Sequence, residues 1–135
     1  MYEELIQAAR AARANAYAPY SHFAVGAAVL AASGRVYSGC NVENASYGMT
    51  NCAERTAIFT AIAEGERHLT TLAVIADTPC PATPCGACRQ VMAEFKIDQV
   101  IMCNTKGEQQ VVSMAKLLPG AFTKTDLPGK DAADE

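Results

Sequence analysis

Residues 72–90 have the sequence LAVIADTPCPATPCGACRQ, and this stretch decides the class of the fold. Its first part, residues 72–76, is a continuous apolar run, which is typical of a strand covered on both faces. Prolines then punctuate a loop, and residues 85–95 are predicted to form a helix. A buried strand that leads through a loop into a helix indicates a sheet with helices packed on its faces.

The flanking segments extend this pattern in both directions. Apolar residues at helical spacing predict an opening helix over residues 2–17, ended by Pro19. Further elements are expected as follows: a hairpin of strands 23–31 and 36–42 that turns at Ser33-Gly34, a helix over 52–63 stopped by Gly65, a buried strand at 99–103, a short strand near Val111-Val112, and a helical turn through Leu117-Leu118.

This order of elements predicts an α/β fold. We expect a single domain over residues 1–135 with three layers, formed by a mixed five-stranded sheet and helices on both of its faces. Residues 123–135, which end in a run of polar and acidic residues, are expected to be a flexible tail.

The composition limits the class of function. The chain has 135 residues, of which 50% are hydrophobic and 19% are charged, and this amount of apolar material suits one globular domain. Its formal net charge is −3 and its basic residues are scattered, whereas polynucleotide binding needs a basic stripe. We therefore expect a small-molecule ligand and neither a nucleic-acid nor a membrane partner.

Six cysteines point to metal binding or catalysis. The N-terminal sequence is acidic where a signal peptide would be basic, so we expect a cytoplasmic protein whose thiols stay reduced. In that compartment a disulfide framework is not expected.

Two short segments carry the chemistry: Asn51-Cys-Ala-Glu-Arg55 and Pro84-Cys-Gly-Ala-Cys-Arg-Gln90. Each precedes a predicted helix, whose free N–H groups and partial positive charge favour a thiolate at its first residues. Cys85 and Cys88 share one helical turn and can chelate one ion, and Cys52 would supply a third ligand. Three protein ligands leave a position for water, which is the arrangement of a catalytic zinc site.

Glu54 is the candidate acid–base catalyst. It lies two residues beyond Cys52, close enough to reach a water at the zinc without being a ligand. Asn51 and Glu54 also match a capping box, and the pair alone favours that structural use. The neighbouring Cys52 and the distant Pro-Cys-x-x-Cys motif favour catalysis instead.

The charge of three thiolates on one Zn²⁺ suggests a role for a nearby cation. Arg55 and the two helix dipoles could offset the excess negative charge, so Arg55 is a hypothetical partner of the metal ligands. Arg89 is expected to be an ordinary surface arginine.

Taken together, these motifs resemble the cytidine deaminase family, in particular its small, homotetrameric, three-cysteine branch. Further segments from about Tyr20 to Phe122 are also similar to that family: Tyr20-Ser-His-Phe23, Val25-Gly-Ala-Ala28, Gly39-Cys-Asn-Val-Glu-Asn-Ala-Ser-Tyr47 and Leu117-Leu-Pro119, followed by Ala121-Phe122. The resemblance implies hydrolytic deamination of cytidine and deoxycytidine to uridine and deoxyuridine with release of ammonia, as in pyrimidine salvage, with one Zn²⁺ per subunit.

The resemblance also implies roles for individual residues. Glu54 would move the proton, and Cys52, Cys85 and Cys88 would bind the zinc. The remaining roles concern the substrate: Asn41 and Glu43 would hydrogen-bond the ribose 3′-hydroxyl, Phe23 would pack on the pyrimidine, the Ala53 N–H would donate to the ring carbonyl, the Thr83 carbonyl would accept from the amine, and Ala45, Tyr47 and Phe122 would reach the site of a neighbouring subunit.

The residues themselves leave structural alternatives open. Phe23 could be a core residue, Asn41 and Glu43 could form a solvated strand edge, and Phe122 could be a plain hydrophobic residue near the end of the chain. Cys40 and Cys103 are expected to be small buried apolar residues, and Cys80 has no assigned role.

Three other functions compete with this hypothesis. A deaminase for another cytosine compound, such as blasticidin S, would share the zinc motifs. A redox protein would use Cys85 and Cys88 in a thioredoxin-like layout, which leaves Cys52 and Glu54 unexplained. A structural four-cysteine zinc site would add Cys80 as the fourth ligand.

Overall fold

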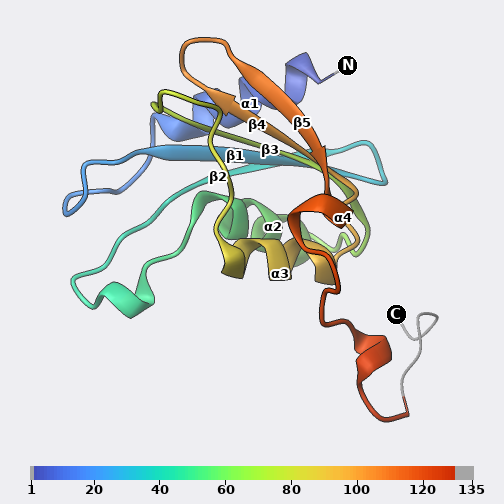
Figure 1. Ribbon diagram of the computed structural model, residues 1–135. Coiled ribbons are helices and arrows are strands. Elements are labelled where there is room, and N and C mark those ends of the chain that lie inside the picture. The colour runs from blue at the N-terminus through green and yellow to red at the C-terminus, as the bar shows by residue number, and fades with distance from the viewer. Residues whose placement is uncertain (1, 130–135) are drawn as a thin grey trace.

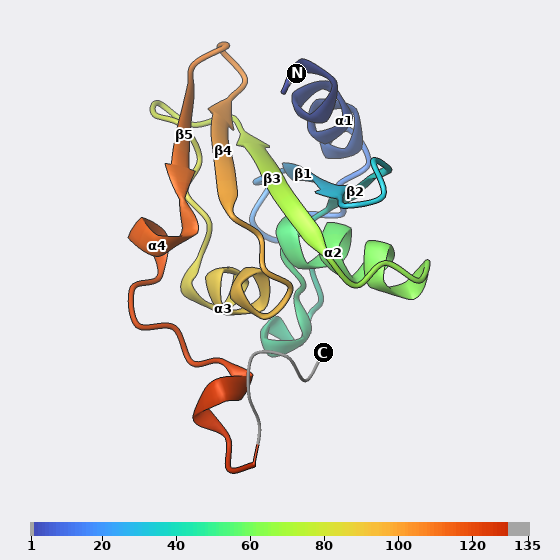
Figure 2. The same cartoon turned by 90° about the vertical axis from the view of Figure 1, so that its right-hand side faces the viewer.

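The computed structural model describes residues 2–129, and five strands form one mixed sheet in the order β2-β1-β3-β4-β5. The strands are β1 (Val25–Ala31), β2 (Val36–Cys40), β3 (Leu69–Ala76), β4 (Gln99–Asn104) and β5 (Gln109–Ser113). Only β3 and β4 are parallel, and the other neighbouring pairs are antiparallel. Figures 1 and 2 show this sheet at the centre of the molecule.

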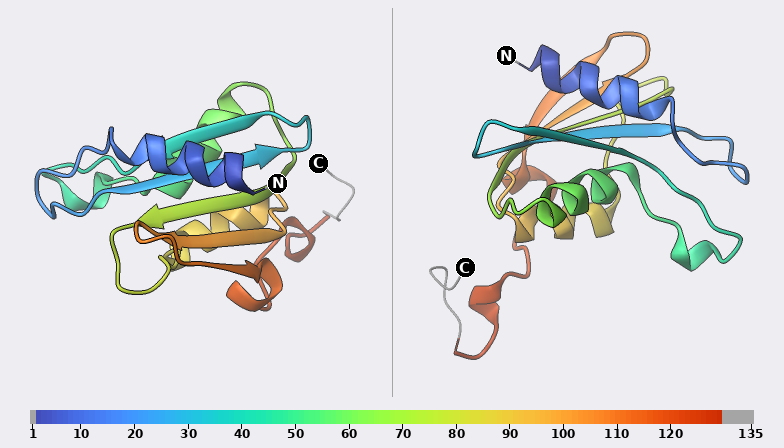
Figure 3. Two further views of the ribbon diagram at one scale, coloured as in Figure 1. Left: turned by 90° about the horizontal axis from the view of Figure 1, so that it is seen from above. Right: turned by 180° about the vertical axis from the view of Figure 1, so that it is seen from behind.

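Helices cover both faces of the sheet. Helix α1 (Glu3–Arg13) lies on one face, and α2 (Ala53–Ala63) and α3 (Gly86–Glu94) lie side by side on the other, as Figure 3 shows from above and from behind. The short α4 (Met114–Leu117) follows β5. The predicted fold class, a mixed five-stranded sheet between helices, is confirmed.

Strand β3 alternates between two hydrophobic cores. Leu72 and Val74 face the core under α2 and α3, whereas Ala73 and Ile75 face the core under α1. All four are buried, which confirms that residues 72–76 form a strand covered on both faces. Because β3 is parallel to β4, α3 forms the crossover between them, and the loop from β3 to α3 begins at the carboxyl edge of the sheet.

Two glycines let the helices approach the sheet closely. A Cβ atom on Gly26 in β1 would lie 2.0 Å from the Ala9 carbonyl oxygen of α1. A Cβ on Gly39 in β2 would lie 2.6 Å from the Ala57 nitrogen of α2. Neither position has room for a side chain, so both glycines are needed for the packing distance between layers.

The opening helix is shorter than predicted: α1 ends at Arg13, whereas the predicted helix ended at residue 17. Beyond it, the Tyr17 N–H donates to the Asn41 carbonyl at 3.0 Å, and the Tyr17 carbonyl accepts from the Glu43 N–H at 2.9 Å. Residues 41–43 therefore take the backbone groups that a longer helix would have used. For the same reason β2 ends at Cys40 and not at residue 42, and Val42 forms isolated bridges with Tyr17 and Asn51.

The C-terminal segment leaves the body of the fold after α4 (Figure 1). Lys124–Asp126 form the short 3-10 helix η2, with a capping box between Thr123 and Asp126. The tail was expected over residues 123–135, and its last part, 130–135, lies outside the described residues. Within residues 2–129, no helix has the length and apolar character needed to cross a membrane.

Candidate active site

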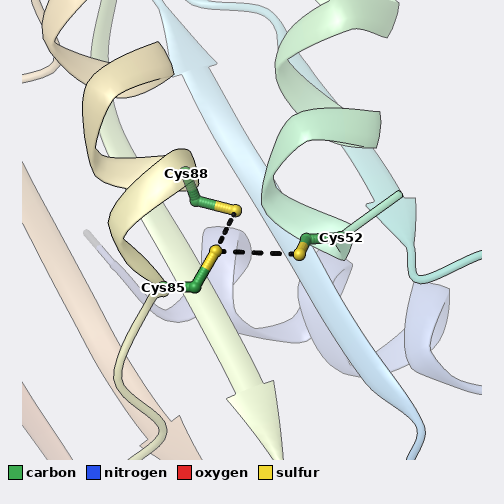
Figure 4. A group of neighbouring side chains, drawn as sticks. All are labelled: Cys52, Cys85 and Cys88. Atoms are coloured by element: carbon green, nitrogen blue, oxygen red, sulfur yellow. Dashed lines mark hydrogen bonds between the residues drawn. The ribbon is translucent and has the colours of Figure 1, made fainter. Parts of the chain in front are cut away.

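Three cysteine side chains from two helices converge on one point (Figure 4). The Sγ atoms of Cys52 and Cys85 are 3.8 Å apart, and those of Cys85 and Cys88 are 3.3 Å apart. All three sulfurs lie within 4.8 Å of one another. Sulfurs bound at about 2.3 Å to one tetrahedral ion lie about 3.8 Å apart, so this donor set fits a single Zn²⁺.

The local backbone explains why these cysteines meet. Cys52 and Cys85 are the N-cap residues of α2 and α3, and both have extended backbone conformations. Cys88 lies in the first turn of α3 and is fully buried, whereas Cys85 is exposed. Two helix N-termini therefore point their free N–H groups and positive dipole ends at the thiols, which favours thiolate and hence metal binding.

Hydrogen bonding concentrates negative charge on one of the sulfurs. A hydrogen bond from Cys88, helped by bonds from Arg55 and Cys85, lowers the pKa of Cys52 to about 5 against the opposing effect of burial. The same bond between the two sulfurs raises the pKa of Cys88 far above its usual range. Cys52 is thus a thiolate at neutral pH, the form in which a cysteine binds zinc.

Arg55 lies against this thiolate. Its Nη2 donates to Cys52 Sγ at 3.2 Å, and this bond holds the pKa of the guanidinium above its ordinary value. Arg55 Nε is buried and has no hydrogen-bond partner among the described residues. The side chain therefore places a fixed positive charge beside the cysteine cluster, where the sequence suggested one.

Glu54 is buried beside the cluster and is not used as a cap. Only 5% of the residue is exposed, and burial raises the pKa of its carboxyl group to about 7, with a further contribution from the Cys52 charge. The capping-box alternative is wrong: the N-cap residue is Cys52, and Asn51 Nδ2 donates to Thr56 Oγ1 at 3.0 Å. A carboxyl group with a pKa near neutrality is suited to accept and return a proton.

These groups open onto a cavity of about 290 Å³ at the carboxyl end of β3. That volume is near the lower end of the range for small-molecule sites, about 300 Å³. Cys52, Glu54 and Cys85 form part of its lining, together with apolar residues of β3 and residues of the loop that follows it. In parallel α/β sheets ligands bind at this edge, so the position agrees with the topology.

The structure brings some of the expected substrate-binding residues to this cavity but not others. Four of them line it, namely Phe23, Asn41, Ala53 and Thr83. Glu43 and Tyr47 line an adjacent hollow of about 390 Å³, which shares Thr50 with the cavity. Ala45 and Phe122 line neither. Phe23 is 44% exposed, so the alternative that it is a core residue is wrong.

The three residues expected to reach a neighbouring subunit are all on the surface. Tyr47 is 76% exposed and Phe122 is 58% exposed, and Ala45 is also exposed. Large apolar side chains near Tyr47 share this exposure, among them Tyr20, which packs edge-on against the Tyr47 ring, and Met49.

Arg89 is not the plain surface residue that the sequence suggested. Its Nε donates to the Pro84 carbonyl and its Nη1 to the Leu117 carbonyl, both at 2.9 Å. The adjacent Gln90 Nε2 donates to the Phe122 carbonyl at 2.7 Å. Helix α3 thus ties the loop before Cys85 to the segment after α4. The Cys88-Arg-Gln90 motif drew attention to these two side chains in the sequence. Most of their hydrogen-bond partners lie far away in the chain, so the contacts could not be inferred.

The other cysteines take no part in the cluster. Among residues 2–129, the group that could hold a metal ion contains Cys52, Cys85 and Cys88 and excludes Cys80, so the four-cysteine alternative is not supported. Cys103 is buried in the core under α1, as expected, and Cys40 is partly buried.

The chain is similar to known proteins both in sequence and in structure. Residues 1–104 match the family model described as "Cytidine and deoxycytidylate deaminase zinc-binding region". A cytidine deaminase from Sporosarcina psychrophila is 56% identical over 127 residues, which are 93% of each protein. One from Halalkalibacterium halodurans is 54% identical over 125 residues, covering 91% of this chain and 95% of that protein.

Solved structures agree with these sequence matches. The crystal structure of a cytidine deaminase from Burkholderia pseudomallei superimposes with a TM-score of 0.87 at 52% identity, covering 90% of this chain and 99% of that one. The enzyme from Mycobacterium tuberculosis superimposes with a TM-score of 0.78 at 40% identity, covering 90% and 96%.

Proposed function

This chain belongs to the cytidine and deoxycytidylate deaminase family, and from that premise we propose that it is a zinc-dependent cytidine deaminase. It hydrolyses cytidine and deoxycytidine to uridine and deoxyuridine with release of ammonia, a step of pyrimidine salvage. The observation that carries this proposal is the cluster of Cys52, Cys85 and Cys88 beside the buried Glu54 in one cavity.

We assign one Zn²⁺ per subunit to the three cysteines. When bound, it supplies Lewis-acid activation of water at neutral pH. The chain contributes three thiolates, the Arg55 charge beside Cys52, and the positive ends of two helices. The Arg55 charge and the two helix ends compensate the excess negative charge of three thiolates on one Zn²⁺.

Glu54 moves the protons. It takes one from the attacking water and delivers it to ring N3 as the water oxygen adds to C4. It then takes the second proton, from the C4 hydroxyl group, and delivers it to the amino group, so that the C4 carbonyl forms as the C4–N bond breaks and ammonia leaves. The raised pKa of Glu54, about 7, supports this role because the carboxyl group can both accept and return a proton near neutral pH.

The remaining lining residues position the nucleoside. Phe23 packs on the pyrimidine, and the Ala53 N–H donates to the ring carbonyl. Ala53 begins α2, so its N–H is among those that a helix leaves without an internal partner. The Thr83 carbonyl accepts from the amine. Asn41 and Glu43 are assigned to the 3′-hydroxyl, although the present partners of both side chains are backbone groups or Ser21.

We further propose that the enzyme is a cytoplasmic homotetramer with shared active sites. The exposed Tyr47 and Phe122 support this, because large apolar side chains at the surface mark interfaces between proteins. Ala45, Tyr47 and Phe122 would each reach a neighbour's cavity. All six cysteines are free, which suits a reducing compartment.

The test is ultraviolet absorbance of cytidine and deoxycytidine with the purified protein, alongside its zinc content. We expect conversion to the uridine products, loss of conversion on chelation, and recovery when Zn²⁺ is returned. Zinc without conversion of either nucleoside would reject this substrate class, and a panel of other cytosine compounds would then identify the correct one. Thiol–disulfide exchange by a zinc-free protein would favour the redox alternative.

A further inference from the structure

Two of the three metal-ligand cysteines occupy the same position in their helices. Cys52 is the N-cap residue of α2 and Cys85 is the N-cap residue of α3, and their sulfurs turn toward each other (Figure 4). An N-cap side chain usually accepts a hydrogen bond from a backbone N–H of the first turn, which stabilises the start of the helix. Among the described residues, neither cysteine side chain makes such a bond. Both sulfurs therefore stay available to a metal, and other groups must fix the two helix starts.

At α2, the helix start is fixed by a side-chain hydrogen bond that spans the cysteine. Asn51, the residue before Cys52, donates from Nδ2 to Thr56 Oγ1 at 3.0 Å. Thr56 lies four residues after Cys52, and its hydroxyl donates to the Cys52 carbonyl at 3.1 Å, beside its own N–H at 3.0 Å. The Thr56 hydroxyl thus uses its one proton on the carbonyl and a lone pair on the amide, which fixes its rotation. These bonds close a ring around the Cys52 backbone.

The same two positions are joined at α3. Arg89 lies four residues after Cys85, and its N–H donates to the Cys85 carbonyl at 3.0 Å. Its Nε donates at 2.9 Å to the carbonyl of Pro84, the residue before the cysteine. In a hydrophobic staple, apolar side chains at these two positions touch and fix the angle at which the chain enters the helix. Here hydrogen bonds join them, and we call the pairs Asn51–Thr56 and Pro84–Arg89 polar staples.

Both polar staples are attached to the body of the fold. The Asn51 backbone exchanges two hydrogen bonds of 2.9 Å with Val42, and the Pro84 side chain is fully buried. Thr56 packs closely on β2, because a Cβ on Gly39 would lie 2.8 Å from Thr56 Cβ. The backbone of each N-cap cysteine is therefore held by the rest of the protein, which is what a precisely placed set of metal ligands requires.

We propose that the two polar staples position the metal ligands, by setting the direction in which each N-cap thiol reaches the ion. Asn51, Thr56 and Arg89 are then positioning residues, since they belong neither to the cysteine cluster nor to the lining of the cavity. The proposal rests on the proposed function for the role of the metal and is independent of the substrate. Its consequence is that the loss of one hydroxyl group at Thr56 weakens metal binding, although that hydroxyl bonds only to Asn51 and to the Cys52 backbone.

The test compares Thr56→Val with Thr60→Val as a matched control. Valine keeps the branched shape of threonine at the close contact with Gly39 but removes both bonds of the hydroxyl group. Thr60 lies one turn further along α2, and its hydroxyl makes the same kind of bond, to the Thr56 carbonyl at 2.7 Å, on the exposed surface. A second variant, Thr56→Ser, keeps the hydroxyl group and removes only the methyl group.

The first measurement is the affinity of the folded protein for Zn²⁺, by competition with a chelator and without substrate. Thr56→Val should bind zinc at least about 10-fold more weakly than the wild type, as expected when a group that holds a metal ligand is lost. Thr60→Val and Thr56→Ser should stay within about 3-fold of the wild type. Unchanged affinity in Thr56→Val would overturn the proposal. An equal loss in Thr56→Ser would also overturn it, because the effect would then come from packing of the methyl group.

The second measurement uses the protein loaded with Co²⁺, whose thiolate-to-metal charge-transfer absorption depends on the arrangement of the sulfurs around the ion. The absorption should change in Thr56→Val and in Asn51→Ala, and the double variant should match Thr56→Val, because both changes break the Asn51–Thr56 bond. Thr60→Val should keep the spectrum of the wild type. Wild-type spectra in both Thr56→Val and Asn51→Ala would show that the thiols take their places without the staple, and the proposal would be wrong.

These measurements separate the proposal from the choice of substrate. If the wild-type protein binds zinc but converts neither cytidine nor deoxycytidine, the proposed function fails. The affinity of Thr56→Val for zinc still decides whether the polar staple positions the ligands.

Discussion

The two walls of the cavity are built in different ways. The inner wall consists of Cys52, Glu54 and Cys85, with the buried Cys88 beside them, and lies at the N-termini of α2 and α3 above the main hydrophobic core. The outer wall, Phe23 with its supports Asn41 and Glu43, lies in loops held by side-chain hydrogen bonds. The groups that we propose to react thus stand at the ends of packed helices, and the groups that we propose to recognise the substrate stand in loops.

The largest expected effect comes from removing an inner-wall ligand. Cys88→Ser replaces a buried thiol that we assign to the metal, and we expect the affinity for zinc to fall more than about 100-fold. Loss of a residue that only hydrogen-bonds a metal ligand usually lowers metal affinity by up to about 100-fold, so loss of a ligand itself should lower it further. Activity should be lost with the metal. Cys80→Ser is the matched control, because Cys80 is exposed and lies outside the cluster. Zinc content by mass spectrometry and turnover by absorbance check this; full zinc occupancy in Cys88→Ser would exclude it as a ligand.

A smaller effect is expected where the inner wall is tied to the C-terminal segment. Arg89→Ala removes two bonds to carbonyl groups, and we expect a loss of about 2 kcal/mol in the free energy of unfolding. Arg89→Lys should recover part of it, since an ammonium can still reach one carbonyl. Denaturant titration measures the difference.

The control for this change is Arg67→Ala. Arg67 also donates to two carbonyls, at 3.0 and 2.7 Å, but on the exposed surface. Its loss should cost less than about 1 kcal/mol. Equal losses of unfolding free energy in Arg89→Ala and Arg67→Ala would mean that the hydrogen bonds of Arg89 stabilise the fold no more than those of an exposed arginine.

A substitution in the outer wall should weaken substrate binding and leave the rate of the chemical step nearly unchanged. Phe23→Leu removes the aromatic face offered to the pyrimidine, and we expect KM for cytidine to rise about 5- to 10-fold with little change in kcat. Phe59→Leu is a suitable control, because Phe59 is 47% exposed, close to the 44% of Phe23, but does not line the cavity. A fall in kcat with unchanged KM would assign Phe23 to the chemical step.

The smallest effect is the pH response of the outer wall. The pKa of Glu43 is lowered, chiefly by the hydrogen bond from the Ser21 hydroxyl. The bonds of the charged carboxylate to Tyr20 and Ser21 are therefore fully present above 4.5, the pKa of the group in the unfolded chain. They are lost as the pH falls through the lower pKa of the folded protein. The amide resonances of Tyr20 and Ser21 should therefore shift with one midpoint below 4.5 in the wild type. The same shift in Glu43→Gln would show that another group causes it.

The difference between the walls also separates what the sequence could predict from what it could not. The inner wall is built from two local motifs: Cys52 and Glu54 share one helix turn, as do Cys85 and Cys88, and the two motifs together suggested one metal site and one acid–base residue. The apolar run at 72–76 likewise predicted the buried strand. The chelating pair and the buried strand needed only neighbours in the chain, whereas the addition of Cys52 to the pair rested on the two motifs occurring together.

The outer wall depends on contacts between distant segments. Glu43 accepts hydrogen bonds from Ser21 and Tyr20, which lie 22 and 23 positions earlier in the chain. Arg89 donates to Leu117, which lies 28 positions later. No local pattern indicates such partners, which is why Arg89 was expected to be a surface residue and Phe23 was open to interpretation as core. The early end of α1 has the same origin, since Tyr17 pairs with residues 41 and 43.

The proposed reaction requires a division of tasks within the inner wall, with zinc held by the cysteines and protons moved by Glu54. Glu54→Gln tests it most directly, by zinc content and turnover of cytidine on the same preparation. We predict that zinc content and KM stay close to the wild type while kcat falls at least about 100-fold, the usual contribution of a positioned acid–base group. Substantial turnover in this variant would contradict the role of Glu54, and loss of zinc together with turnover would show that Glu54 supports the metal instead.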